Sequence, residues 1–362
     1  MNPSDLLQLL SIPGLGSYRI RQLVGLLHSP AAVLNASVRE LCQVQGVEKK
    51  TAERILRGPD LEFVEDQIQS AERADIQLIS FWDADYPEYL KQIHDAPILL
   101  FCKGNVDLLQ KGGISIVGTR NATHAGKRCA ETFAREMAFQ SVPVISGMAR
   151  GIDTAAHEGT LRAGGHTIAV LGCGLDVIYP PENEKLFRSI IETGLALTEF
   201  PMHTEPINSN FPKRNRIISG LSDGVVVVEG GLKSGALITA LLALEQGKDV
   251  FAVPGNIYNS QSKGCHHLIK QGAKLVEKSS EVLEEFPQWA VSTFQKKADT
   301  LEPGSLSNAE KQLWQLLSNE PIHIDQLVKR ADSTTAEALS ILLGLELKGA
   351  VKQLSGMMFI RQ

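Results

Sequence analysis

From residue 111 to about residue 286, short apolar runs alternate with segments whose apolar residues recur at helical spacing. The run Val225–Val228 is β-branched throughout, which is typical of a central strand covered on both faces. The alternation predicts an α/β fold with a Rossmann-like doubly wound parallel sheet. The predicted strands are Ile114–Gly118, Val142–Ser146, Thr167–Leu171, Ala196–Phe200, Val225–Val228 and Val250–Val253.

The first sixty residues contain a weak internal repeat. A turn of alternating apolar residues and glycine at Ile12–Gly16 precedes a helical stretch, and a similar turn follows thirty-two positions later at Val44–Glu48. This pattern indicates a helix-hairpin-helix module, whose glycine-rich turns can offer backbone N–H groups to a phosphate. Glu48 stands where the pattern expects glycine. Phosphate binding and a purely structural packing role therefore both stay open.

The whole chain divides by pattern into five parts. Three helical stretches and a hairpin with its turn at Ser355-Gly356 predict a winged helix at the C-terminal end. The parts are a helical helix-hairpin-helix or SAM-like module at 1–60, a connecting segment of the extended core at 61–110, the Rossmann-like core at 111–286, a linker at 287–306, and the winged helix at 307–362. The connecting segment contains a predicted strand at Ile98–Cys102.

Composition excludes several classes of protein. The net charge of the 362 residues is -5, so a nucleic-acid site must be a local patch rather than a property of the whole surface. The 5 cysteines are scattered without a C-x-x-C pair, which indicates reduced thiols and not a disulfide framework or a zinc site. No basic leader and no long uncharged apolar run occurs, so we expect a cytoplasmic protein without a membrane segment.

Two glycine-rich loops that follow predicted strands carry candidate chemistry, because ligands of doubly wound sheets bind at the carboxyl ends of the strands. In the first, Gly118 permits a tight turn, Thr119 offers a hydroxyl and Arg120 offers a bidentate donor. The structural alternative is an Arg120 paired with a neighbouring acid, Glu199 or Glu229. The second loop runs from Ser146 to Asp153, where Ser146, Gly147 and Arg150 suit a phosphate and Asp153 suits a helix N-cap.

Two further segments add charge to the same sheet edge. Phe211 to Arg216 places Lys213, Arg214 and Arg216, with Asn215, at the start of a helix, where cations oppose the helix dipole. An uncompensated cation cluster beside a phenylalanine suits a polyanion with bases to stack, and a salt-bridged helix start is the alternative. After Val225–Val228, Ser234 can cap a helix and Gly235 frees backbone donors.

The sequence contains few of the residue patterns that indicate a catalytic site. The histidines His157, His166, His203, His266 and His267 lack metal-ligand spacing, and neither G-x-S-x-G nor H-E-x-x-H occurs. The glycine-rich loops also lack the lysine of a P-loop and the spacing of a dinucleotide fingerprint. We therefore expect a binding protein with no catalytic residue, no metal and no cofactor.

The motifs, taken in order, resemble the bacterial DNA-processing protein A family (DprA, also called Smf). The resemblance covers residues 80–286, and the helical module and the winged helix fit the longer members. The segments that carry it are Gly118–Arg120, Ser146–Asp153, Ala169–Asp176, Tyr179–Asn183, Phe211–Arg216, Ser234–Ala240 and Val253–Asn256.

The resemblance implies a recombination mediator. Such proteins bind single-stranded DNA, form homodimers, and load RecA recombinase during natural transformation, displacing or cooperating with single-strand-binding protein, without nucleotide hydrolysis. Arg120 becomes the leading phosphate contact. The DNA-binding residues implied for this chain are Gly118, Thr119, Arg120, Ser146, Gly147, Arg150, Phe211, Lys213, Arg214, Asn215, Arg216, Ser234 and Gly235.

Two rival interpretations remain. The core also resembles nucleotide-binding enzymes of the nucleoside-monophosphate phosphoribohydrolase type, although the helix that follows Gly235 has no acid before Glu245. A regulator that binds duplex DNA through the winged helix is the other rival. Acids balance bases in that module, so it is as well suited to protein docking as to reading a duplex.

Overall fold

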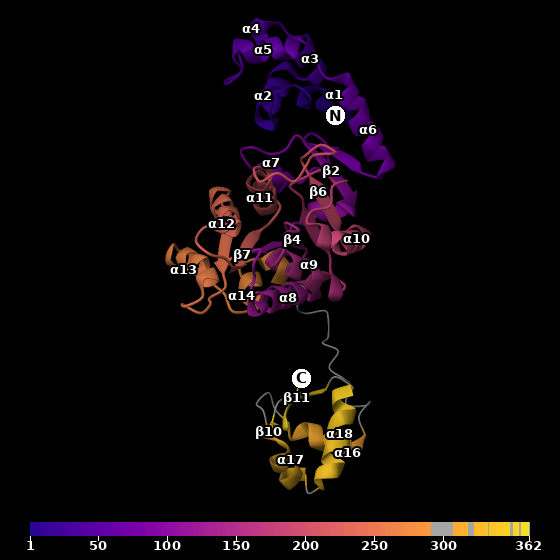
Figure 1. Cartoon of the computed structure of the whole chain (residues 1–362), viewed down its shortest axis with the longest axis vertical. Helices are drawn as coiled ribbons and strands as arrows, with labels where there is room; N and C mark the ends of the chain where they lie inside the picture. The colour runs from indigo at the N-terminus through magenta and orange to yellow at the C-terminus, as the bar shows by residue number, and fades with distance from the viewer. Residues whose placement is uncertain (291–306, 318–321, 332, 348–349, 355, 362) are drawn as a thin grey trace. The chain divides into compact units, whose positions relative to one another are not determined.

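The computed structural model describes residues 1–290, 307–317, 322–331, 333–347, 350–354 and 356–361. The chain divides into two compact units, Met1–Ser292 and Thr293–Gln362 (Figure 1). Each unit has hydrophobic clusters of its own. Within the described residues, no helix combines the length and the apolar character needed to span a bilayer.

A nine-stranded sheet forms the centre of the first unit, in the order β1-β2-β6-β5-β4-β3-β7-β8-β9. The strands from β3 to β9 are parallel, whereas β2 is antiparallel to both β1 and β6. The chain moves outward from β3 to β6 and then returns to place β7 beside β3, so the strand order reverses between β3 and β7. The strands are β1 (Gln77–Ser80), β2 (Leu99–Gly104), β3 (Ile114–Gly118), β4 (Val144–Ser146), β5 (Thr167–Val170), β6 (Leu195–Thr198), β7 (Gly224–Glu229), β8 (Asp249–Ala252) and β9 (Lys274–Leu275).

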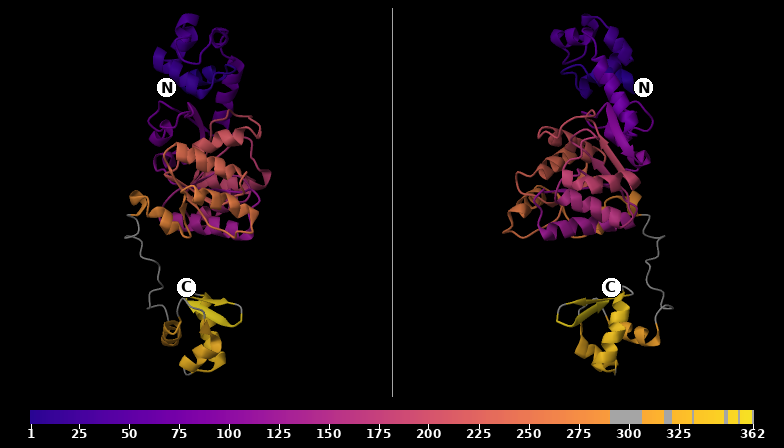
Figure 2. Two further views of the ribbon diagram at one scale, coloured as in Figure 1. Left: turned by 90° about the vertical axis from the view of Figure 1, so that its left-hand side faces the viewer. Right: turned by 45° about the vertical axis from the view of Figure 1, so that its right-hand side comes forward.

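Helices cover both faces of this sheet, which confirms the predicted doubly wound α/β fold (Figure 2). Side chains alternate across a strand, so Val225 and Val227 of β7 pack with α11, α12 and α13 while Val226 and Val228 pack with α8 and α9. The central strand is therefore buried on both sides, as its β-branched run predicts. The helices are α8 (His124–Phe139), α9 (Ile152–Arg162), α10 (Glu184–Thr193), α11 (Asn210–Gly220), α12 (Gly235–Glu245), α13 (Lys263–Lys270), α14 (Ser279–Leu283) and α15 (Pro287–Ala290).

The N-terminal helices share a hydrophobic cluster with the β2 side of the sheet, where Leu99 and Phe101 join Ile20 and Leu23. Two arginines bind the first hairpin turn: Arg19 donates to the carbonyl of Gly14 at 3.0 Å and Arg54 to that of Pro13 at 3.2 Å. The helices of this part and the short helices nearby are α1 (Pro3–Leu10), α2 (Ser17–Leu27), α3 (Pro30–Asn35), α4 (Val38–Leu41), α5 (Lys49–Leu56), α6 (Leu61–Arg73), α7 (Glu88–Lys91), η1 (Val106–Gln110), η2 (Pro181–Asn183) and η3 (Ser260–Ser262).

The second unit is a winged helix, as predicted. Its three-stranded sheet has the order β10-β12-β11, and Leu327, Leu342 and Phe359 lie in its core. The predicted linker at 287–306 begins with α15, and its residues 291–306 lie outside the described part of the chain. The elements are α16 (Asn308–Gln315), β10 (Ile322–His323), α17 (Ile324–Ala331), α18 (Thr335–Leu347), β11 (Val351–Leu354) and β12 (Met358–Arg361).

Candidate nucleic-acid interface

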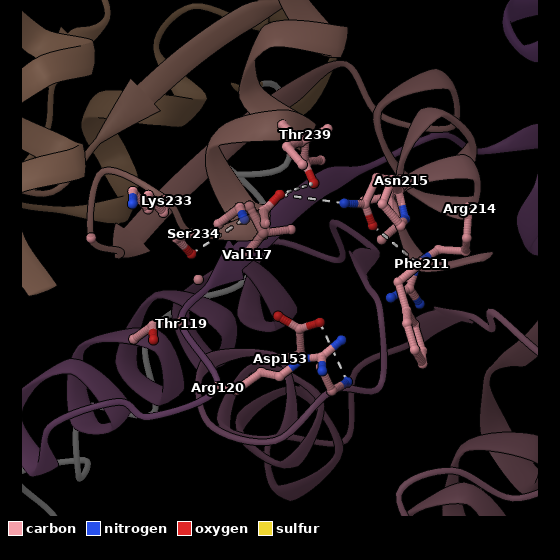
Figure 3. Close-up of a pocket in the computed structure, with 18 of the residues that line it drawn as sticks. Val117, Thr119, Arg120, Asp153, Phe211, Arg214, Asn215, Lys233, Ser234 and Thr239 are labelled. Carbon is pink, nitrogen blue, oxygen red and sulfur yellow. Dashed lines mark hydrogen bonds between the residues drawn. The ribbon is translucent and has the colours of Figure 1, made fainter. Parts of the chain in front are cut away.

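A pocket of about 480 Å³ opens at the carboxyl ends of β3 and β7, where the strand order reverses (Figure 3). Strands on either side of such a point send their following helices to opposite faces of the sheet, which leaves a crevice between the two loops. The loops after β3 and β7, the start of α9, the first turns of α11 and the start of α12 line it. Loops far apart in the sequence therefore meet at one site.

Arg120 is held at this pocket by the loop after β3. The Thr119 N–H donates to the Glu229 carbonyl at 2.7 Å, which ties the loop to the end of β7. The Arg120 guanidinium lies 4.8 Å over the centre of the Phe211 ring. Among the described residues no carboxylate pairs with it, and the side chain is exposed. Arg120 therefore presents a cation without a described carboxylate partner, held over an aromatic ring.

The acids that could have paired with Arg120 have other partners. Glu199 forms an ion pair with Arg216. Glu229 accepts the N–H of Thr123 at 2.8 Å and the side-chain amide of Asn259 at 3.1 Å. The structural alternative for Arg120 is therefore wrong.

The loop after β4 positions Asp153, but not as the N-cap that the sequence suggests. Gly151 is the N-cap of α9, with φ 81° and ψ -117°, and Asp153 lies inside the first turn. Its carboxylate accepts the N–H of Gly147 at 3.1 Å and that of Ala149 at 3.4 Å. Burial raises the pKa of Asp153 to about 6, against the opposing charge of Arg214. The N-cap prediction is wrong because Asp153 stabilises the loop that precedes the helix rather than the first free N–H groups of the helix.

The other predicted residues of this loop lie away from the pocket. Ser146 is buried, and its hydroxyl donates to the Ile116 carbonyl at 2.7 Å. Gly147 and Arg150 line a smaller adjoining hollow together with Arg120 and Phe211. The Arg150 guanidinium forms an ion pair with Glu182.

The cations of α11 have separate environments. At 100° per residue, positions 213, 214 and 216 of a helix face different directions. Lys213 is exposed and does not line the pocket. Arg214 lines the pocket floor but is buried, and it donates to the carbonyls of Gly147, at 2.6 Å, and Val170. Burial lowers its pKa to about 10.

Arg216 lies outside the pocket altogether. It is 8% exposed and forms ion pairs with Glu199 and, at 3.0 Å, with Asp95. Burial raises the pKa of Glu199, and the adjacent Arg216 charge opposes that rise. The prediction of an uncompensated cluster is therefore wrong for Arg216, because its charge is balanced inside the protein.

The amino end of α12 completes the site. Ser234 is the N-cap, as predicted, and its hydroxyl oxygen accepts the N–H of Ala236 at 3.4 Å. The Asn215 side-chain amide donates to the Gly235 carbonyl at 3.3 Å and so joins α11 to α12. Lys233 precedes the cap, is exposed, and forms no ion pair within the described part of the chain. A helix N-terminus and a free lysine together favour an anion.

The structure thus gathers most of the predicted residues at one pocket. Those that line it are Gly118, Thr119, Arg120, Phe211, Arg214, Asn215, Ser234 and Gly235. Lys233, Asp153 and Gln261 also line it and were not predicted as site residues. Lys233 could have been predicted as a site residue, since it is a cation directly before a recognisable N-cap. Asp153 was missed because it was interpreted as a structural N-cap and not as a residue that lines the pocket.

The class of protein is defined by its fold and its site. It combines a doubly wound α/β sheet, which has a cationic pocket at its switch point, with a helix-hairpin-helix module and a winged helix. The chain belongs to the family described as DNA recombination-mediator protein A, which residues 77–287 match. Residues 297–357 match the DprA winged helix domain, and residues 6–58 match the SAM-like helix-hairpin-helix tandem. The predicted family is confirmed.

Individual relatives agree with this assignment. The chain is 46% identical over 223 residues to DNA processing protein DprA of Streptococcus pneumoniae, covering 62% of this chain and 79% of the relative. It is 38% identical over 318 residues to protein Smf of Escherichia coli, covering 87% of this chain and 85% of the relative.

Solved structures show the same fold. The X-ray structure of DprA from Streptococcus pneumoniae superposes with a TM-score of 0.70 at 37% identity, over 79% of this chain and 98% of that one. DNA processing protein A from Helicobacter pylori, solved in work on its single-stranded DNA binding mode, has a TM-score of 0.53 at 32% identity, over 58% of this chain and 95% of that one.

Proposed function

We propose that this protein binds single-stranded DNA through the pocket between β3 and β7, and that the bound strand is the substrate of its role as a recombination mediator. The observation that carries the proposal is the pair of cations at the pocket without partners among the described residues, the Arg120 guanidinium and the Lys233 ammonium, which lie beside the N-terminus of α12. Phosphates supply the missing negative charge. The Helicobacter pylori relative, described in terms of its single-stranded DNA binding mode, supports the same ligand.

The experiment is fluorescence anisotropy of a labelled single-stranded oligonucleotide across a salt series, with duplex as competitor. Binding carried by phosphate contacts loses affinity steeply between about 50 and 200 mM salt. Arg120→Ala removes a charge-assisted contact and lowers the affinity by at least about tenfold. Lys185→Ala is the matched control, because Lys185 is an exposed cation of α10 that lies outside the pocket and outside the predicted site. Binding that is insensitive to salt and to Arg120 contradicts the proposal.

The finer role follows from the family resemblance. We infer that the protein loads RecA recombinase onto single-stranded DNA during natural transformation, in the cytoplasm, and that it displaces or cooperates with single-strand-binding protein. The test is the rate of RecA nucleation on DNA coated with single-strand-binding protein, with native protein and with Arg120→Ala. Acceleration by the native protein alone supports loading, and equal rates contradict it.

We also infer that the protein acts as a homodimer. A groove of about 480 Å³ between α12 and α13 is lined by Leu237, Ile238, Leu241 and Leu268. Exposed apolar side chains surround it, with Leu241 50% and Leu244 51% exposed, and these support a second copy of the chain as the partner. Light scattering after size exclusion measures the mass. A monomer for the native protein contradicts the inference, and dissociation by Leu241→Glu supports it.

Binding, and not hydrolysis, is the proposed activity. The glutamate that a nucleoside-monophosphate phosphoribohydrolase carries near its phosphate loop has no counterpart in α12 before Glu245. Release of a free base from a nucleoside monophosphate would support that enzyme instead. Tighter binding of duplex than of single strands would favour a regulator that acts through the winged helix.

A further inference from the structure

Asp153 is an acid inside a pocket built for an anion. Among the described residues that line the pocket, Asp153 is the only one with a carboxylate side chain. Arg120, Arg214 and Lys233 supply positive charge. The side chain is 6% exposed. A buried carboxylate repels phosphate strongly, because little water screens it. The acid makes the floor less favourable for the DNA backbone than the rim, where Arg120 and Lys233 lie, so we expect another part of the nucleotide to face Asp153.

One of the two carboxylate oxygens is committed to the protein. Oδ2 accepts the backbone N–H groups of Gly147, at 3.1 Å, and Ala149, at 3.4 Å, which fix the orientation of the side chain. Within the described residues, Oδ1 has no hydrogen-bond partner and no cation forms an ion pair with the carboxylate. Figure 3 shows Asp153 reaching into the space between Arg120 and the loop that carries Ser234. The floor thus offers a fixed acceptor that faces the pocket and that no described protein group occupies.

At the rim of the pocket the free polar groups are hydrogen-bond donors, in contrast to the acceptor at its floor. Arg120 and Lys233 are unpaired donors at the exposed rim. The Asn215 amide is held in place by the protein: one of its N–H groups donates to the Gly235 carbonyl and its oxygen accepts from Arg214 at 3.2 Å. Donors at the rim and an acceptor at the floor complement a nucleotide whose phosphate stays at the rim and whose base enters edge first.

We propose that Asp153 is a specificity-determining residue that accepts N–H donors from the edge of one inserted nucleobase, and that the pocket therefore prefers guanine. The inference rests on the proposed function, since it specifies which part of the single strand enters the same pocket. A carboxylate can only accept, and guanine presents two adjacent donors, N1–H and the N2 amino group, on its Watson–Crick edge.

The other bases fit this acceptor less well. Adenine and cytosine each present one amino donor beside a ring nitrogen whose lone pair faces the carboxylate. Thymine presents one N–H between two carbonyl oxygens, both of which Asp153 repels. Hypoxanthine is guanine without the N2 amino group, so it tests that donor without changing the size of the ring or its other polar atoms.

The test compares labelled oligothymidines of equal length that carry one central guanine, hypoxanthine or adenine, measured by anisotropy at one salt concentration. For the native protein we expect the guanine strand to bind at least about fivefold more tightly than plain oligothymidine, and more tightly than the hypoxanthine strand. The ratio of two affinities at the same salt removes the contribution of the phosphates.

Asp153→Asn keeps the size of the side chain and abolishes the guanine preference. Glu182→Gln is the matched control: it removes one negative charge from the neighbouring Arg150 pair outside the pocket and keeps the preference. Equal binding of guanine and hypoxanthine strands by the native protein, or a guanine preference that survives in Asp153→Asn, overturns the inference while the proposed function stands. Failure of every strand to bind overturns the proposed function itself. If Asp153→Asn does not fold, equal binding of the guanine and hypoxanthine strands by native protein still overturns the inference.

Discussion

At the scale of single residues, Arg120 and Arg216 have different roles because, among the described residues, only Arg216 is paired with acids of the protein. Arg120 is exposed and has no carboxylate partner in the described part of the chain, so its charge is available to a ligand. Arg216 is 8% exposed and neutralises Glu199 and Asp95. A buried cation in an internal ion pair contributes to the fold, and its removal leaves an uncompensated acid.

Arg216→Ala is therefore expected to act on stability. It leaves Glu199 buried without its partner, which costs about 3–5 kcal/mol of unfolding free energy. Urea denaturation followed by circular dichroism measures this loss. The double variant Arg216→Ala with Glu199→Gln should recover a large part of it, because the charge then left without its partner, Asp95, is 53% exposed and stays hydrated. Equal stability of native protein and Arg216→Ala would show that this pair contributes nothing.

His157 gives a second residue-scale prediction, which concerns acid. Its Nδ1 lies 2.7 Å from the Thr167 hydroxyl, which itself donates to the Val144 carbonyl at 2.7 Å. Nδ1 must therefore carry the proton, and the buried Nε2 has no partner among the described residues. Burial, with a smaller effect of Arg214, lowers the pKa of His157 to about 3. In the unfolded chain His157 binds a proton near pH 6.5, whereas in the folded chain it stays neutral down to about pH 3. His157 therefore lowers the free energy of unfolding as the pH falls from about 6.5 to 3.

The measurement is the difference in unfolding free energy between native protein and His157→Gln at pH 7.5 and at pH 5. We expect the variant to gain about 2 kcal/mol relative to native protein over this interval. Asp153 acts in the opposite sense, since burial raises its pKa to about 6 and the folded chain binds its proton first. Both proteins carry Asp153, so its effect cancels in the comparison. A difference that does not change with pH contradicts the assignment of the neutral imidazole.

At the scale of elements, Gly151 joins two loops of the site. It has φ +81°, and a Cβ there would lie 2.3 Å from the Thr119 carbonyl oxygen and 2.7 Å from that of Arg120. Gly164 has φ +69°, but a Cβ there meets nothing within 4 Å. Alanine at either position must adopt a positive φ, which costs about 1–3 kcal/mol. Only at Gly151 must it also displace the backbone that carries Arg120.

We therefore expect Gly151→Ala to destabilise the protein more than Gly164→Ala does and to weaken binding of single-stranded DNA in the molecules that remain folded. Urea denaturation and anisotropy on the two variants measure the two effects. Gly164→Ala should leave the affinity unchanged, because it touches no part of the site. Equal behaviour of the two variants would show that the contact between the loops after β3 and β4 is unimportant for binding.

The sequence predicted the elements far better than the environments of individual charges. β-branched and apolar runs located β3 to β8, since burial on both faces leaves a local signature, whereas the short strands β1 and β9 at the sheet edges leave none. The meeting of the loops after β3 and β7 follows from topology and was predictable. The partners of Arg216 were not, because Asp95 is far away in the sequence and the direction of a side chain depends on helix phase.

At the scale of the whole molecule, the site belongs to one unit. Every residue that lines the pocket lies in Met1–Ser292. The hydrophobic clusters of that unit contain no residue of the winged helix, whose own cluster runs from Leu313 to Phe359. Each unit therefore buries a core without the other, which is the condition for independent folding.

A fragment of residues 1–290 should consequently bind single-stranded DNA with the affinity and the salt slope of the full chain. The slope counts the phosphates that the protein neutralises, so it reports any loss of contacts directly. Anisotropy across one salt series, on the fragment and on the full chain, makes the comparison, and a cooperative thermal transition shows that the fragment is folded. A shallower slope for the folded fragment would assign phosphate contacts to the winged helix. An unchanged slope leaves the winged helix free for another partner, which agrees with the near balance of acids and bases in residues 307–362.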